Sequence, residues 1–294
     1  MDPIWWLPLA ICTALFTAFK DLLGKRSVAK KDPWAVASAM HLIAFLVLLP
    51  LLPFMQRPAI GSDFWWALLG SGSINVAAMI LYLKALQAAD LSLTTPMLTT
   101  TPLFLLVTSP IIVGETPSAM GLIGVVLIFL GAYLLNISQR HLGFWAPFKA
   151  LWDHKGPRYM LLVAFMFSIS SNLDKVGILN SSPLFWLFCL FAFISAGTLT
   201  LALYHGHSPR EVLVDEPLSL SLQGVLFSAA ALSQFFAIQL TMVPYVIAIK
   251  RTSALIAVGL GIWLLKESGG RERITGALVM FGGFLFITFA GQSG

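Results

Sequence analysis

Two stretches of this chain carry the same pattern of residues. Residues 100–131 read TTPLFLLVTSPIIVGETPSAMGLIGVVLIFLG, and residues 252–283 read TSALIAVGLGIWLLKESGGRERITGALVMFGG. At a constant offset of 152 positions the two stretches share Thr100 with Thr252, Leu103 with Leu255, Glu115 with Glu267, Gly124 with Gly276, Phe129 with Phe281 and Gly131 with Gly283. A glutamate and two glycines at one offset are hard to attribute to chance, even in an apolar chain. The pattern indicates an internal duplication.

The duplication extends outward into both halves of the chain. An offset of 150 positions relates Lys25 to Lys175, and each lysine precedes a proline, Pro33 or Pro183, by eight residues. We expect one unit at residues 1–139, a connector at 140–157 and a second unit at 158–294. Internal duplication in a polytopic membrane protein is the usual construction of a secondary transporter.

The composition predicts a protein that uses lipid as its solvent. Of the 294 residues, 58% are hydrophobic and 11% are charged, and the mean hydropathy is +0.86. A soluble domain carries about 25% charged residues. A bilayer core requires roughly 20 apolar residues per helix, and ten such stretches are present: 4–23, 34–54, 64–87, 92–114, 119–137, 158–179, 183–204, 219–240, 244–265 and 273–291. The sequence therefore predicts an all-α polytopic membrane protein with ten transmembrane helices, five in each half, and leaves no room for a soluble catalytic domain.

Several other classes of protein are disfavoured. Cys12 and Cys189 both fall inside predicted spans, which argues against a disulfide or a thiolate metal site. The first apolar stretch has no basic residues before it, so we interpret it as a retained helix and not as a cleaved signal peptide. The net charge of +5 comes largely from loops, where it bears on orientation and not on nucleic acid. We expect no metal and no cofactor.

The repeated stretches and their flanks carry a family resemblance. The first half contains YLKAL at 82–86, SLTTP at 92–96, TTPLF at 100–104 and GE at 114–115, and the second half contains VPY at 243–245, IKRTSAL at 249–255 and KE at 266–267. Over nearly its whole length the chain resembles the EamA-type family of the drug/metabolite transporter superfamily. The second copy departs from the family pattern at Lys266, in place of glycine, and at Ala254, in place of proline.

The resemblance implies two inverted five-helix repeats around a central cavity lined mainly by helices one to four and six to nine. It also implies export or exchange of amino acids, metabolites, drugs or sugar conjugates, which leaves the substrate open. Relatives place both termini in the cytoplasm. Lysine and arginine instead gather in the first, fifth and ninth connectors, and the positive-inside rule would then put both termini outside. The sequence leaves the orientation open.

Lys250 and Arg251 are the sharpest candidates for a site. They lie about 9–10 Å beyond Pro244 along a helix, which is within the depth of the bilayer. Cations at that depth are costly and normally face a cavity or a partner, whereas the alternative is a pair that reaches the interface. We predict that Lys250 faces the cavity and binds substrate, and that Arg251 has a structural role towards a neighbouring helix.

Uncharged polar residues at helical depth are the other candidates for substrate binding. Thr94 and Thr95 belong to a threonine-rich helix with two prolines, where hydroxyls either bond to freed carbonyls or line a polar wall. Asn75, Asn172 and Gln234 contact either the substrate or neighbouring helices. Both interpretations stay open for each of the five residues.

Histidine and glutamate are the candidates for proton coupling. His41 lies inside the second predicted span, where it either titrates near neutral pH or stays neutral and bonded to a hydroxyl. Glu115 and Glu267 each precede a span, and we assign them a structural role at a helix N-terminus, with proton carriage as the alternative.

Gly124 and Gly276 are predicted to be packing residues. Each lies seven residues before another glycine, Gly131 or Gly283, so that both members of a pair fall on one helix face. Such a face lets a neighbouring helix backbone approach closely.

The sequence favours a secondary active transporter for a small polar or amphipathic metabolite, working by alternating access. The alternative is an intramembrane enzyme acting on a lipid-linked substrate, but the chain lacks Gly-x-Ser-x-Gly, His-Glu-x-x-His and paired acids within the predicted spans. The partners expected are a small-molecule substrate, the lipid bilayer of a bacterial inner membrane and protons, with the protein as a monomer or homodimer.

Overall fold

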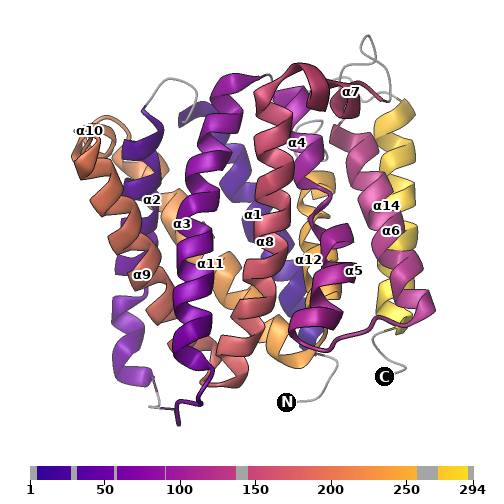
Figure 1. The fold of residues 1–294 in the computed structure, drawn as a ribbon, viewed down its shortest axis with the longest axis horizontal. Helices are drawn as coiled ribbons and strands as arrows, with labels where there is room; N and C mark the ends of the chain where they lie inside the picture. The colour runs from indigo at the N-terminus through magenta and orange to yellow at the C-terminus, as the bar shows by residue number, and fades with distance from the viewer. Residues whose placement is uncertain are drawn as a thin grey trace.

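The computed structural model describes residues 5–27, 32–55, 58–89, 91–136, 145–256 and 271–290, and within these ranges it contains helices and no strands (Figure 1). The first half comprises α1 (Trp6–Ser27), α2 (Pro33–Leu46), the 3₁₀ helix η3 (Leu49–Phe54), α3 (Phe64–Ala88), α4 (Leu91–Leu98), α5 (Thr101–Ile112) and α6 (Ala119–Asn136). The second half comprises α8 (Lys155–Leu179), α9 (Pro183–Tyr204), α10 (Arg210–Leu213), α11 (Pro217–Leu240), α12 (Val243–Lys250) and α14 (Arg271–Ala290). The short helix α7 (Ala146–Asp153) lies between the halves, within the predicted connector.

The helices agree with the predicted spans in type but not in every length. Six segments of the described chain are long and apolar enough to cross a membrane: α1, α2 together with η3, α3, α8, α9 and α11. Shorter apolar helices cover 96–112, 119–135 and 275–290. The predicted span 244–265 begins with α12 and continues outside the described residues. The chain is an all-helical integral membrane protein, while the number of ten spans stays a prediction.

Proline divides the predicted span 92–114 into two helices. Pro96 lies in α4 and Pro102 in the first turn of α5, with Thr99 and Thr100 between them. Three hydroxyls bond to backbone carbonyls here: Thr99 to Pro96 at 2.7 Å, Thr100 to Met97 at 2.6 Å and Thr101 to Leu98 at 2.8 Å. Because Pro102 lacks an N–H, the carbonyl of Leu98 four residues earlier needs another donor, whereas the carbonyls of Pro96 and Met97 also accept from the backbone N–H groups of Thr99 and Thr100. The hydroxyl of Thr101 supplies this donor to Leu98, which supports the structural interpretation of this helix at that position.

The two halves pack as exchanged copies of one another. α3 packs along α8, and α1 packs along α11, so each half places its third long helix on the first helix of the other. α2 packs on α9, α5 on α12 and α6 on α14. α1 begins and α14 ends at one end of the bundle, whereas α7 lies at the opposite end (Figure 1). We call these the termini end and the α7 end. The first half thus runs from the termini end to the α7 end and the second half runs back, which is the arrangement of an inverted repeat.

The contact between α6 and α14 is built on the repeated glycines. A Cβ atom on Gly124 would lie 2.9 Å from the carbonyl oxygen of Gly283, and one on Gly276 would lie 3.0 Å from that of Gly131. The two helix backbones therefore approach closely at both glycine pairs, which is the packing position that the sequence predicted for Gly124 and Gly276.

Candidate functional site

A buried polar network joins α3 of the first half to α8 and α9 of the second. Ser71 on α3 donates its hydroxyl hydrogen to Asp174 Oδ1 on α8 at 2.6 Å, and its oxygen lies 3.1 Å from the hydroxyl of Ser170. Asn75 Nδ2 donates to Ser170 at 2.6 Å, and Trp186 Nε1 on α9 donates to Asp174 Oδ1 at 3.3 Å. This network places Asn75 at the interface between the halves, in contact with protein groups.

Asn172 belongs to a second contact, between α8 and α5. Its Oδ1 accepts from Ser109 at 2.7 Å, and its Nδ2 donates to Thr108 Oγ1 at 3.0 Å and to the carbonyl of Ser168 at 2.9 Å. The side chain is fully buried. Both of its polar atoms are thus used between or within helices, which supports the interhelical interpretation of Asn172 over substrate contact.

At the termini end, an ion pair connects the halves. Lys175 on α8 pairs with Glu115, which lies between α5 and α6, and Lys175 also donates to the carbonyl of Thr241 at 2.7 Å. Glu115 Oε2 accepts from the backbone N–H of Val243, the first residue of α12, at 2.8 Å. Glu115 therefore meets a helix N-terminus as predicted, but that of α12 in the other half and not that of the helix that follows it. The side chain of the repeated Glu267 lies outside the described residues.

Lys250 and Arg251 lie at the end of α12 and bond to different helices. Lys250 Nζ donates to Gln234 Oε1 on α11 at 2.7 Å, and Arg251 Nη2 donates to Thr101 Oγ1 on α5 at 2.8 Å. α12 is about 12 Å long and starts at the termini end, so both cations lie well inside a bilayer core of about 30 Å. The buried Nε of Arg251 has no hydrogen-bond partner within the described structure. Gln234 thus lies beside Lys250, as expected, and Arg251 reaches a neighbouring helix through a hydroxyl.

Other charged groups share this region. Lys20 and Asp21 on α1 form an ion pair of 3.0 Å, and Lys20 Nζ lies 5.7 Å from the ring centre of Phe227 on α11. The charges of Lys20 and Asp21 act on Lys250, and that of Asp21 also acts on Arg251. Residues from α1, α11 and α12 therefore form one electrostatic environment inside the bundle.

His41 lies in the interior, as predicted. Its ring is 6% exposed, Nδ1 lies 2.9 Å from the carbonyl oxygen of Ala37 one turn earlier in α2, and the ring meets Phe227 edge-on at 5.7 Å. The partner predicted for the ring was a hydroxyl, and the partner found is a backbone carbonyl of the same helix. Its role in proton coupling stays a prediction.

The two threonines predicted to bind substrate are consecutive residues of α4. Thr94 is fully buried in α4. Thr95 follows it in the same helix, but its side chain lies outside the described part of the chain.

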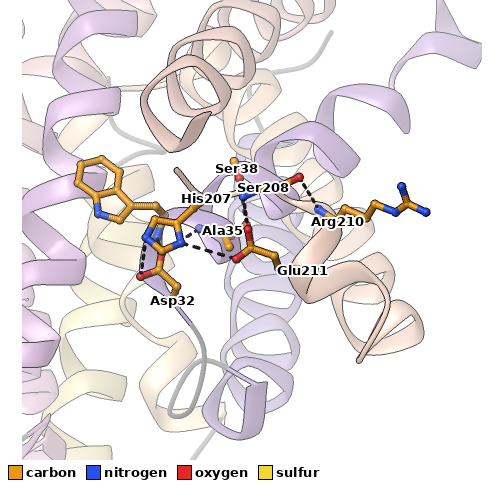
Figure 2. A network of polar contacts seen from close by, with 8 residues as sticks. Asp32, Ala35, Ser38, His207, Ser208, Arg210 and Glu211 are labelled. Carbon is orange, nitrogen blue, oxygen red and sulfur yellow. Dashed lines mark hydrogen bonds and ion pairs between the residues drawn. The ribbon is translucent and has the colours of Figure 1, made fainter. Parts of the chain in front are cut away.

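A further polar cluster lies at the α7 end, between the N-terminus of α2 and the connection from α9 to α10. Asp32 Oδ1 caps α2 by accepting from the backbone N–H of Trp34 at 2.8 Å, while Asp32 Oδ2 lies 3.5 Å from His207 Nε2. His207 Nδ1 lies 3.6 Å from Glu211 Oε2, so the ring sits between two carboxylates (Figure 2). This cluster ties α2 of one half to the α9–α10 connection of the other and lies apart from the buried cations.

Sequence reasoning missed the two inter-half contacts of Asp174 and Lys175. In the sequence, Asp174 was noticeable only as an acid near the end of a predicted span, and Lys175 only as a position of the repeat. The repeat did hold a signal for the ion pair, because Lys175 and Glu115 both recur, as Lys25 and Glu267. No signal pointed to Ser71, which lies 103 positions from Asp174.

Comparisons with known proteins agree with this architecture. A solved crystal structure of another protein superposes on the chain with a TM-score of 0.79, covering 98% of both chains at 14% sequence identity, which shows the shared fold. No curated protein matches the chain. The sequence pattern of the EamA-like transporter family matches residues 4–137 and again residues 154–289, one match for each half. The chain therefore belongs to the EamA-like transporter family.

Proposed function

We propose that this protein is a secondary active transporter that exports or exchanges a small polar or amphipathic metabolite by alternating access between its two halves. The observation that carries the proposal is the exchanged packing of the halves, with α3 on α8 and α1 on α11, together with polar side chains buried in the first of these contacts. Inverted repeats move against one another around a site near the middle of the membrane.

The side chains in this region favour a substrate with a negative group. Lys250 and Arg251 present two cations inside the bundle. The positive charge of Arg251 adds to that of Lys250, and the Lys250 ammonium can donate charge-assisted hydrogen bonds to a carboxylate or phosphate. We therefore propose an anionic or zwitterionic metabolite, bound by Lys250 beside Gln234, with Thr94 and Thr95 as further candidates.

Flux in proteoliposomes tests this function. Purified protein is reconstituted with one of a set of labelled amino acids, phosphorylated sugars or cationic drugs, chosen by thermal-shift screening. We expect counterflow, in which unlabelled compound inside accelerates entry of the labelled compound, and we expect it for an anion or zwitterion. Lys250→Ala should reduce the flux, whereas Lys149→Ala, an exposed lysine of α7, serves as a matched control. Flux without counterflow would contradict a carrier, and counterflow restricted to cations would contradict the proposed substrate class.

The remaining expectations are part of the same proposal. We place the protein in a bacterial inner membrane, as a monomer or homodimer, with protons as the coupling ion. The contacts described above offer nothing in favour of the intramembrane-enzyme alternative, and we do not propose it.

A further inference from the structure

Asp174 is a carboxylic acid placed inside a membrane-spanning helix. It lies about 8 Å from the C-terminal end of α8, at the contact with α3 and α9, and it is 5% exposed. An ionisable residue at such a position is costly, and it is a candidate for an ion or proton pathway by default. The corresponding position in the first half is Gly24, so the repeat does not require an acid here.

The groups that hold Asp174 are neutral. Its Oδ1 accepts from the hydroxyl of Ser71 and from the indole N–H of Trp186, and Ser71 in turn contacts Ser170. Among the described residues, no lysine, arginine or histidine lies within ion-pair distance of this carboxylate. Within the described part of the chain, Asp174 is thus held by hydrogen bonds and not by an ion pair.

The charged groups described near Asp174 do not form an ion pair with it. Lys175, the next residue, is already paired with Glu115, and Lys250 on α12 acts on Asp174 electrostatically without contacting it. The other titratable groups on helices packed against α8 are Tyr82 and Lys84 on α3, Lys149 and Asp153 on α7, Cys189 and Tyr204 on α9, and Tyr245 on α12. None of these bonds to Asp174 within the described structure, and α4, α5 and α11 carry no titratable side chain.

We propose that Asp174 is the site where this protein binds and releases the proton that drives transport. The proposal rests on the proposed function. The carboxylate takes up one proton from water at one side of the membrane to become a neutral acid, and it returns that proton as a carboxylate at the other side.

The hydroxyls around Asp174 suit both of these forms. A serine hydroxyl is both donor and acceptor. Ser71 can therefore donate to the carboxylate, and after rotation of its hydrogen it can accept from the protonated acid. Ser71 belongs to the first half and Asp174 to the second, so the proton changes a contact across the moving interface. This gives protonation a direct means of biasing how the halves pack.

The proton itself is the probe for the test. The full-length protein in lipid nanodiscs is titrated in choline chloride, and the carbonyl stretch of protonated carboxyl groups is followed by infrared difference spectroscopy. Because the 13 Asp and Glu side chains all contribute to this region, we expect one resolved band among them that appears as the pH falls and that is missing in Asp174→Asn. Asp21→Asn, which removes the half-exposed acid of α1, is the matched control and should keep the band.

Two further variants test the proposal even if the Asp174→Asn protein does not fold. Ser71→Ala and Trp186→Phe each remove one donor to the ionised carboxylate, so each should move the midpoint of the band to higher pH. An unchanged band in Asp174→Asn, or an unchanged midpoint in both donor variants, overturns the proposal. Loss of the band in sodium chloride would assign the site to sodium ions and overturn it as well. The titration needs no substrate, so it can fail while the flux experiment succeeds, and the reverse.

Discussion

At the scale of the residue, the two buried cations at the end of α12 bond to two different neighbouring helices. Consecutive residues of a helix point about 100° apart, and Lys250 and Arg251 accordingly bond to α11 and α5. Their depth and their separate directions could be predicted from the sequence. The partner of Arg251 could not, because Thr101 lies 150 positions away and only the packing of α12 on α5 brings it near.

We expect substitutions of these two cations to have different effects. Lys250→Ala should weaken binding of an anionic or zwitterionic substrate by more than its loss of stability explains. Among the described residues the amino group donates to Gln234, and its remaining N–H groups can bind substrate. Arg251→Ala should mainly lower thermal stability, because it leaves Thr101 without this donor. Binding isotherms and melting curves on the same preparations separate the two outcomes. Equal losses of binding and stability in both variants would contradict the assignment.

His41 is expected to be dispensable for coupling. Its Nδ1 bonds within α2 and its ring packs on Phe227, so its described contacts include no titratable group from another helix. With the proton placed at Asp174, His41→Gln should leave the pH dependence of transport unchanged. A flattened pH profile in proteoliposomes would restore the coupling role that the sequence suggested for this histidine.

At the scale of the element, the sequence predicted where helices lie better than where they break. Apolar length located α3, α9 and α11 within a few residues. The sequence predicted the span 92–114 as one helix, whereas the structure divides it between Pro96 and Pro102, since each proline removes a backbone hydrogen bond. The start of α8 at Lys155, inside the predicted connector, was missed, because a helix that extends into a polar region has no apolar signal there.

The glycine contact of α6 and α14 allows a matched test at neighbouring positions. Gly124→Leu or Gly276→Leu should destabilise the protein by about 1–3 kcal/mol, because the added side chain must enter a backbone contact. Gly282→Leu should cost far less, since a Cβ there meets nothing within 4 Å. Thermal unfolding in detergent measures the difference, and substrate preference should stay the same. Normal stability with altered selectivity would contradict the packing role.

At the scale of the whole molecule, the halves are held together at the termini end by the ion pair of Lys175 and Glu115. Each side chain is 11% exposed. Removing one member of a buried pair leaves an uncompensated charge and costs about 3–5 kcal/mol. Because the contact joins the halves, removing one member raises the free energy of the conformation in which the termini end is closed.

Glu115→Gln should therefore open the termini end. With Cys12 and Cys189 replaced by serine, a cysteine introduced at Thr241 should react faster with a water-soluble maleimide in the Glu115→Gln protein than in its parent. The double variant Glu115→Leu with Lys175→Met should be more stable than either single change, since no lone charge remains. Unchanged labelling, or a double variant less stable than both single variants, would contradict a closing role for the pair.

The inverted duplication also bears on which of two conformations, each open at one end of the bundle, the protein adopts at rest. If the halves were identical in sequence, exchanging their conformations would convert a molecule open at one end into a molecule open at the other at no cost in free energy. The two forms would then be degenerate, and unmatched positions decide between them. Asp174 corresponds to Gly24 and Lys250 to Leu98. Since about 1.4 kcal/mol gives a tenfold excess of one form, a few such unmatched residues at the interface are enough to give the carrier a resting direction.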